Sequence, residues 1–159
     1  QKNHYFMVDI ISEAVKLKEN AVIVFLGKGD EMERVREYAI KKGVLKHIEF
    51  MGSRADIAQF YQAMDLFLFP SFHEGLPIAG VEAQAADLPC LFSDAVTDEI
   101  MITDRAVLMP LDLGAASWAK KAVSLAKTHR RKNVSDKITA SGYDAADMGK
   151  RMEQIYERR

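Results

Sequence analysis

Short apolar runs alternate with longer amphipathic stretches along this chain of 159 residues. Apolar residues at helical spacing predict helices over 3–18, 30–43, 54–64 and 76–87. Runs rich in β-branched and other apolar residues predict strands over 21–27, 47–52, 65–71, 88–94 and 106–110. A single helical turn is expected over 97–101. Two or three further helices are expected from about residue 115 to the C-terminus, with a break at Gly142 and Tyr143.

Several residues are of the types that begin or end helices. Asn3 and Asp30 are predicted N-caps, and Gly43 is expected to end the helix over 30–43. Pro77 suits the first turn of the helix over 76–87, where a missing N–H does no harm. The run AVIVFLG over 21–27 is apolar throughout, which is typical of a strand buried on both faces.

Strands and helices that alternate this regularly predict an α/β fold with a parallel sheet, covered by helices on both faces and joined by right-handed crossovers. Ligands of such sheets bind at the carboxyl ends of the strands. The loops that follow the strands are therefore the candidate site, and we expect them to meet at one edge of the sheet. They are GKGD (27–30), GSR (52–54), PSFHEGLP (70–77) and SDAVTDE (93–99).

Composition narrows the class of protein. A hydrophobic content of 48% supports a real core, and the net charge of −1 gives no basic footprint for nucleic acid. The single cysteine, Cys90, excludes an internal disulfide, fits a reducing compartment and is expected to be a small core residue. No apolar stretch approaches the roughly 20 residues that span a bilayer. The chain begins with Gln1, so we expect it to be a fragment of a longer protein.

The loop 70–77 and the helix after it carry two acids, Glu74 and Glu82. A helix N-terminus offers free N–H groups and a positive partial charge to phosphate, and Gly75 permits a tight turn there. Glu74 either caps the helix itself or accepts hydrogen bonds from a bound sugar. Glu82 lies five residues beyond Pro77, about 7–8 Å along the axis, where a ribose diol attached to a diphosphate could reach it. The alternative is that Glu82 simply faces solvent.

The setting of these two acids, P-S-x-x-E-G-L-P-x-x-x-x-E-A, resembles the paired-glutamate signature of retaining glycosyltransferases. Further similar motifs run in order through most of the chain: QKNH (1–4), GKGD (27–30), FMGSR (50–54) and AMDLFLFPS (63–71). Together they resemble glycosyltransferase family 4, the group 1 glycosyltransferases, and within it bacterial capsular and exopolysaccharide enzymes.

The resemblance implies the C-terminal half of a GT-B fold, a Rossmann-like doubly wound parallel sheet that binds a nucleotide sugar. Residues 1–159 would form this one domain, with its first strand and the N-terminal acceptor domain absent, and a C-terminal helix over 144–159 that crosses to the partner domain. The whole enzyme would be cytoplasmic, at or near the inner membrane. It would transfer a sugar, expected to come from a UDP-sugar, to a glycan or lipid-linked acceptor in polysaccharide biosynthesis. The isolated domain is expected to be inactive.

The resemblance also assigns residues. Glu74, at the donor sugar, and Lys2, which neutralises the leaving diphosphate, are the implied catalytic residues, and Glu82 would hold the ribose hydroxyls. The other implied donor-binding residues are Gly27, Gly29, Met51, Gly52, Arg54, His73, Gly75, Leu76, Pro77 and Ile78. For three of these residues an alternative without a role in binding stays open. Lys2 would then be a solvated terminal lysine, Arg54 a solvated residue of the next helix that does not stack on the base, and His73 an ordinary loop residue. One departure is Asp87, which stands where similar sequences commonly have Gly.

Neither a metal nor a cofactor is expected, because the resemblance implies that the helix dipole and basic side chains stabilise the leaving group. Three rival functions share the predicted architecture. A nonhydrolysing nucleotide-sugar epimerase is disfavoured by the EGLP loop and the spacing of the glutamates. A receiver-type signalling domain would need clustered acids at the strand ends, where this chain has mostly Gly, Pro and Ser. A noncatalytic nucleotide-binding module stays open.

Overall fold

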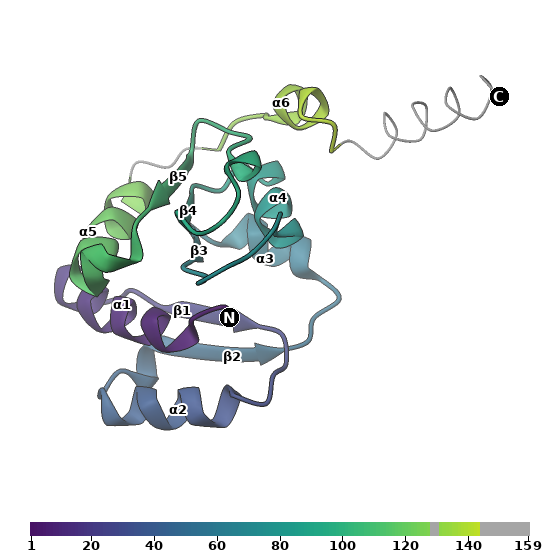
Figure 1. Ribbon diagram of the computed structural model, residues 1–159. Coiled ribbons are helices and arrows are strands. Elements are labelled where there is room, and N and C mark those ends of the chain that lie inside the picture. The colour runs from purple at the N-terminus through teal and green to yellow at the C-terminus, as the bar shows by residue number, and fades with distance from the viewer. Residues whose placement is uncertain (128–130, 144–159) are drawn as a thin grey trace, which may run out of the picture.

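The computed structural model describes residues 1–127 and 131–143 (Figure 1). Its helices are α1 His4–Leu17, α2 Met32–Lys41, α3 Ile57–Ala63, α4 Ile78–Ala85, α5 Gly114–Lys127 and α6 Ser135–Ala140. Its strands are β1 Ile23–Leu26, β2 Ile48–Gly52, β3 Phe67–Phe69, β4 Cys90–Ser93 and β5 Ala106–Met109. Short 3-10 helices cover η1 Leu45–His47, η2 Asp98–Ile100 and η3 Leu111–Leu113. Each predicted strand and the turn over 97–101 are confirmed with shorter bounds, while the helix predicted over 144–159 lies outside the described residues.

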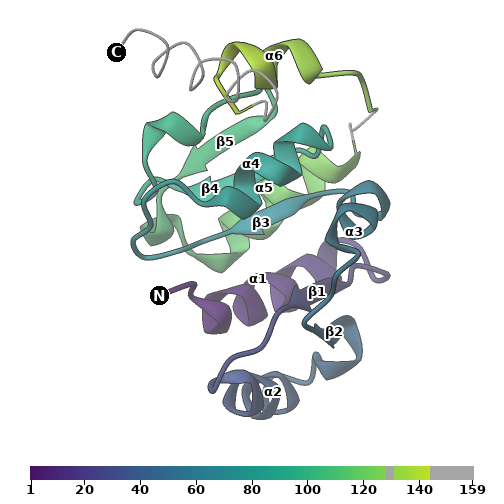
Figure 2. The same ribbon diagram turned by 90° about the vertical axis from the view of Figure 1, so that its right-hand side faces the viewer.

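The strands of the described residues form two parallel sheets rather than one. β1 pairs with β2, and the second sheet has the order β3–β4–β5. α1 and α2 lie side by side on one face of the first sheet, where the hydroxyl of Tyr38 on α2 donates to Asp9 on α1 at 2.9 Å. In Figures 1 and 2, α4 and α5 lie on opposite sides of the second sheet. The expected α/β class, with parallel strands and with helices on both sides of the three-stranded sheet, is therefore confirmed. The single continuous sheet is not, because β1 and β3 do not pair with each other.

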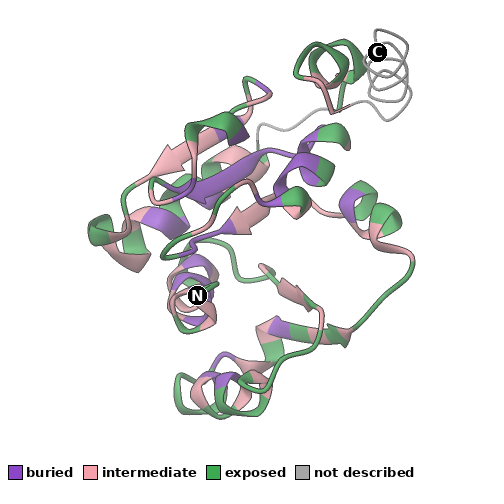
Figure 3. Cartoon of the chain, turned by 45° about the vertical axis from the view of Figure 1, so that its right-hand side comes forward, coloured by how far each residue is buried: buried purple, intermediate pink, exposed green. Residues whose placement is uncertain are grey.

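Burial concentrates on the three-stranded sheet. All four residues of β4 are buried, whereas the residues of β1 are half-buried or exposed. The prediction that 21–27 is buried on both faces is therefore wrong. The physical reason is that α1 and α2 both cover the same face of this sheet, so that Glu49 and Met51 on its other face stay exposed within the described chain. The purple segments of Figure 3 follow β4 and parts of α1 and α4.

Within the part of the chain that the structure describes, two clusters of apolar side chains make up the core. The first joins α1, α2 and α5 and contains the fully buried Trp118, whose indole Nε1–H donates to the carbonyl of Pro110 at 2.9 Å. The second joins α4 to β3, β4 and η2. Cys90 belongs to the second cluster, as predicted, and burial raises the pKa of its thiol, so the group stays protonated and inert. Among the described residues no helix is both long and apolar enough to cross a bilayer.

The predicted helix ends hold in part. Gly43 adopts the left-handed conformation with φ 71° after α2, as expected. Asn3 precedes α1 with φ 58°, and α2 follows Glu31 rather than Asp30; neither helix has a side-chain cap from any described residue. Asn3 thus occupies the predicted N-cap position of α1 but makes no capping bond with its side chain, and the prediction for Asp30 is wrong, because residue type alone does not fix the backbone geometry that capping requires. Pro77 stands just before the first residue of α4 instead of within its first turn.

Candidate functional site

The N-terminus of α4 is the central feature of the candidate site. Pro77 precedes the helix in an extended conformation, and no side chain in the described parts of the chain caps the first turn. The Pro77 carbonyl accepts from the N–H groups of Gly80, at 2.8 Å, and Val81, at 3.3 Å. The earlier N–H groups of the helix have no intrahelical acceptor, so the uncapped end can receive an anion.

The loop before α4 is held from two sides. Glu74 forms an isolated parallel bridge with Val96, in the loop after β4. The side-chain Nε2 of Gln1 donates to the His73 carbonyl and to Glu74 Oε2, each at 3.2 Å, and the N–H of Phe72 donates to the Gln1 carbonyl at 3.0 Å. Glu74 therefore does not cap α4, and that alternative is wrong. Its half-buried carboxylate lies beside the chain's first residue.

Glu82, on α4, is exposed and is also anchored. The hydroxyl of Tyr61, on α3, donates to Glu82 Oε2 at 3.2 Å. The Tyr61 side chain is only 8% exposed. Burial, followed by the charge and hydrogen bond of Glu82, raises the pKa of Tyr61, so the phenol stays a donor. Glu82 thus faces solvent, as the alternative stated, but one of its carboxylate oxygens accepts a hydrogen bond from Tyr61.

Gly27, which follows β1, is hydrogen-bonded to Gly52, the last residue of β2. The Gly27 N–H donates to the Gly52 carbonyl at 2.7 Å, and the two residues have φ of 117° and 64°. Because side chains rarely adopt such angles, glycine is required at both positions. Met51 beside them is 41% exposed, and Gly29 is also exposed. Gly27 and Gly52 are therefore direct neighbours in the structure, with the exposed Met51 next to them.

Arg54 lies two residues after Gly52 and already has partners. Its Nε and one terminal nitrogen donate to the two carboxylate oxygens of Asp56, each at 2.8 Å. Its guanidinium carbon lies 5.4 Å from the centre of the Phe60 ring. The hydrogen bond from Arg54 is the main cause that lowers the pKa of Asp56. Arg54 is thus an exposed, ion-paired residue just before α3. This environment resembles the alternative in which Arg54 is a solvated residue that does not stack on the base.

The other predicted residues of the 73–78 loop differ in exposure. His73, Gly75 and Ile78 are exposed, Leu76 is half-buried and Pro77 is buried. Ile78 is 63% exposed, an unusual position for isoleucine, and it stands at the open end of α4. Lys2 is exposed beside Gln1. Its charge contributes, after burial, to lowering the pKa of His4, whose ring packs edge-on against Phe25.

Sequence reasoning missed two residues that hold the site. One is Tyr61, whose aromatic ring reads as ordinary core. The other is Gln84, a fully buried amide on α4. Gln84 Nε2 donates to the carbonyls of Gly80 and Ile100, and its Oε1 accepts from the N–H and hydroxyl of Thr103. The sequence signal that could have identified Gln84 is its position as a polar residue among the small apolar residues of α4.

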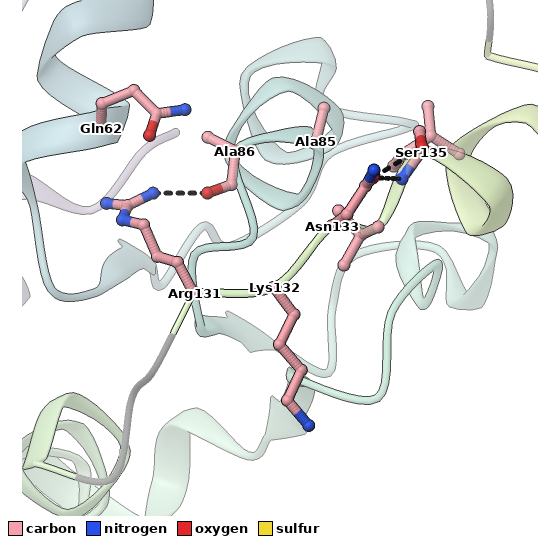
Figure 4. Close-up of a pocket in the computed structure, with 9 residues that line it drawn as sticks. Gln62, Ala85, Ala86, Arg131, Lys132, Asn133 and Ser135 are labelled. Carbon is pink, nitrogen blue, oxygen red and sulfur yellow. Dashed lines mark hydrogen bonds between the residues drawn. The ribbon is translucent and has the colours of Figure 1, made fainter.

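A cavity of about 290 Å³ lies at the C-terminus of α4, the end of the helix opposite to the predicted site (Figure 4). It is lined by Ala85, Ala86 and the segment from Arg131 to Ser135, among others. The guanidinium of Arg131 donates to the carbonyls of Ala86, Tyr61 and Met64, at the C-termini of α4 and α3. Those bonds already engage the charge of Arg131. We therefore place the site at the N-terminus of α4.

Comparison with known proteins gives the class. The family profile of "Glycosyl transferases group 1" matches residues 1–128, and the chain belongs to this family. Among curated relatives, the putative glycosyltransferase EpsF of Bacillus subtilis (strain 168) is 31% identical over 152 residues. A UDP-Gal:alpha-D-GlcNAc-diphosphoundecaprenol alpha-1,3-galactosyltransferase of Escherichia coli is 32% identical over 97 residues. These matches cover 91% and 59% of the chain, but only 38% and 25% of the two relatives.

Solved structures agree on the fold. Anabaena Alr3699/HepE in complex with UDP superposes with a TM-score of 0.79 at 15% identity, covering 99% of this chain and 46% of the other. The pneumococcal O-GlcNAc transferase GtfA, in complex with UDP and GlcNAc, gives a TM-score of 0.82 at 19% identity, covering 99% and 33%. The Rossmann-like class expected from the sequence is confirmed by this likeness. The chain spans less than half of each of these proteins.

Proposed function

We propose that this chain is the donor-binding domain of a retaining glycosyltransferase that takes its sugar from a nucleotide diphosphate, UDP foremost. The single observation that carries the proposal is the uncapped N-terminus of α4, with Glu74 before it and Glu82 one turn inside it. The relatives named for polysaccharide and lipid-linked sugar transfer, and the neighbours crystallised with UDP, support the same conclusion.

The proposed binding mode places each group by its chemistry. The diphosphate lies at the first turn of α4, where free N–H groups and the helix dipole favour negative charge. Glu82 accepts hydrogen bonds from the ribose hydroxyls, and Glu74 lies at the sugar. The base lies against Gly27, Met51 and Gly52. Lys2 is exposed and follows Gln1, whose side chain is hydrogen-bonded to Glu74. Its positive charge stabilises the negative charge of the leaving diphosphate.

The proposed reaction needs no protein nucleophile. The bond between the anomeric carbon and the β-phosphate oxygen breaks, and the acceptor hydroxyl oxygen bonds to the same face of the sugar. Its proton passes to the departing phosphate oxygen. The protein contributes positioning and stabilisation of the developing phosphate charge. We expect the domain alone to bind nucleotide without turnover, since the acceptor would be held by a separate domain.

We also propose that the complete domain has a further strand, N-terminal to α1. β1 and β3 each lack a neighbour on one side within the described chain. A parallel strand between them would give the order β2–β1–strand–β3–β4–β5. This is the doubly wound order 3-2-1-4-5-6 of dinucleotide-binding sheets. The unpaired edges therefore support a longer enzyme of which this chain is one domain. The diphosphoundecaprenol acceptor in the name of the Escherichia coli relative supports the further proposal that this enzyme is cytoplasmic and acts near the membrane.

A thermal-shift panel tests the proposal. The protein is heated with UDP, GDP, ADP and uridine, each at equal concentration. A nucleoside diphosphate at 100 times its Kd should add about 2.7 kcal/mol to the free energy of unfolding. We expect UDP to stabilise most and uridine, which lacks the diphosphate, much less.

The matched variants are Glu82→Ala, in the proposed site, and Glu37→Ala, an exposed acid on α2 outside it. Glu82→Ala should lower the shift with UDP, and Glu37→Ala should leave it unchanged. If no nucleotide shifted the melting temperature, or if Glu82→Ala bound UDP as well as the wild type, the assignment of this site would be wrong.

A further inference from the structure

Tyr61 is buried at the C-terminal part of α3 and is fixed at both ends. Its ring packs edge-on against Phe67, with 6.2 Å between ring centres, and its own carbonyl accepts from Arg131 at 2.7 Å. Only 8% of the residue is exposed. A side chain held in this way has little rotamer freedom left to lose when it makes another contact.

Its hydroxyl is the one polar group of this side chain, and it reaches out of the core to Glu82. The distance from the Tyr61 hydroxyl oxygen to Glu82 Oε2 is 3.2 Å. Since the pKa of Tyr61 is raised, the phenol donates this hydrogen bond at every pH near neutrality. An exposed glutamate would otherwise sample several rotamers, and each bond to a ligand would cost ordering entropy.

We propose that Tyr61 is a positioning residue for ribose recognition: it holds Oε2 of Glu82 so that Oε1 accepts from the vicinal hydroxyls of the bound nucleotide. The inference rests on the proposed function and extends it from binding to discrimination between ribose and deoxyribose. The tyrosine does not touch the ligand. It acts by fixing the carboxylate before the ligand arrives, which lowers the entropy cost of binding.

The test is calorimetric titration of the protein with UDP and with 2′,3′-dideoxy-UDP, which lacks both ribose hydroxyls. Four proteins are compared: wild type, Tyr61→Phe, Glu82→Ala and the double variant. Phenylalanine keeps the ring that packs on Phe67 and removes only the hydroxyl. We expect Tyr61→Phe to weaken UDP binding about three- to tenfold and to leave dideoxy-UDP unchanged. In the Glu82→Ala background the same change should have no further effect.

The outcomes separate this inference from the proposed function. If Glu82→Ala binds UDP like the wild type, the ribose contact itself is wrong and both proposals fall. If Glu82→Ala weakens binding and Tyr61→Phe does not, only the positioning role is overturned. Equal weakening toward both nucleotides by Tyr61→Phe would indicate a general structural effect and would also overturn it.

A second variant covers the case in which Tyr61→Phe does not fold, as judged by circular dichroism. Glu82→Asp keeps the charge but withdraws the carboxylate from Tyr61 by one methylene. It should reduce the preference for UDP over dideoxy-UDP while leaving dideoxy-UDP affinity unchanged. Full retention of the preference in Glu82→Asp would contradict the proposal.

Discussion

Gly80 sets how closely α4 approaches β4. A Cβ at this position would lie 2.7 Å from Cε1 and 3.0 Å from Cζ of Phe92, and 3.1 Å from Cδ1 of Ile100. Phe92 and Ile100 are fully buried, so neither ring nor methyl can move away freely. We expect Gly80→Ala to lower the free energy of unfolding by about 1–3 kcal/mol, although alanine is the better helix former by about 1 kcal/mol. Urea denaturation measures the change.

Gly29→Ala is the matched control. A Cβ there meets no described atom within 4 Å, and its φ lies outside the left-handed region. We expect a change in the free energy of unfolding of no more than about 0.5 kcal/mol. A neutral or stabilising Gly80→Ala would show that the contact between α4 and Phe92 is looser than these distances indicate.

Asp87 illustrates a residue whose cost and benefit oppose each other. Its φ of 55° is left-handed, which costs an aspartate more than a glycine. Its buried carboxylate, however, lies 3.2 Å from the Arg105 guanidinium and accepts from the Lys132 N–H at 2.5 Å. Breaking a buried ion pair costs more than the strain, so Asp87→Gly should destabilise by about 2 kcal/mol. Chemical denaturation measures the change.

Asp87→Asn separates the two contributions, since it keeps the backbone strain and the acceptor oxygen but loses the charge. It should destabilise less than Asp87→Gly. If glycine instead stabilised the protein, backbone strain would outweigh the ion pair. The departure from the glycine of similar sequences would then be a defect, not a gain.

At the scale of elements, Arg131 links the C-termini of α3 and α4, two helices that lie far from it in the sequence. Its three hydrogen bonds satisfy carbonyls at the C-termini of α3 and α4, where a cation also complements both helix dipoles. We expect Arg131→Gln to lower the free energy of unfolding by about 1–2 kcal/mol. Lys132→Gln is the control with the same charge change, because Figure 4 shows the Lys132 side chain pointing away from the Ala86 carbonyl. Equal effects of the two variants would rule out capping by Arg131.

The sequence pattern predicted the strands and the helices of residues 1–127 well, because apolar periodicity reflects which side of an element is buried. It failed where a contact depends on distant residues. The bonds of Arg131 span 45 to 70 positions, and the Asp87–Lys132 bond spans 45. Nothing local to either residue marks those partners. The candidate site shows the same limit: spacing identified Glu74 and Glu82 as candidates, but not Tyr61, which is 21 positions from Glu82.

At the scale of the whole molecule, the division into two sheets was also beyond the pattern. An apolar run predicts a strand but does not tell whether both of its edges are paired. β1 and β4 have similar apolar sequences, IVFL and CLFS, yet only β4 pairs on both sides and is fully buried. The difference comes from their neighbours in space, which no window of sequence contains.

This division predicts unequal stability across the molecule. The amides of β4 should exchange with deuterium only through global unfolding, since its residues are buried and paired on both sides. The amides of β1 should exchange at least about tenfold faster, through local opening at its unpaired edge. Hydrogen exchange followed by NMR measures both strands in one experiment, with Leu91 and Val24 as reporters. Equal protection of the two would mean that the unpaired edge of β1 is covered in solution, and that the two sheets open as one cooperative unit.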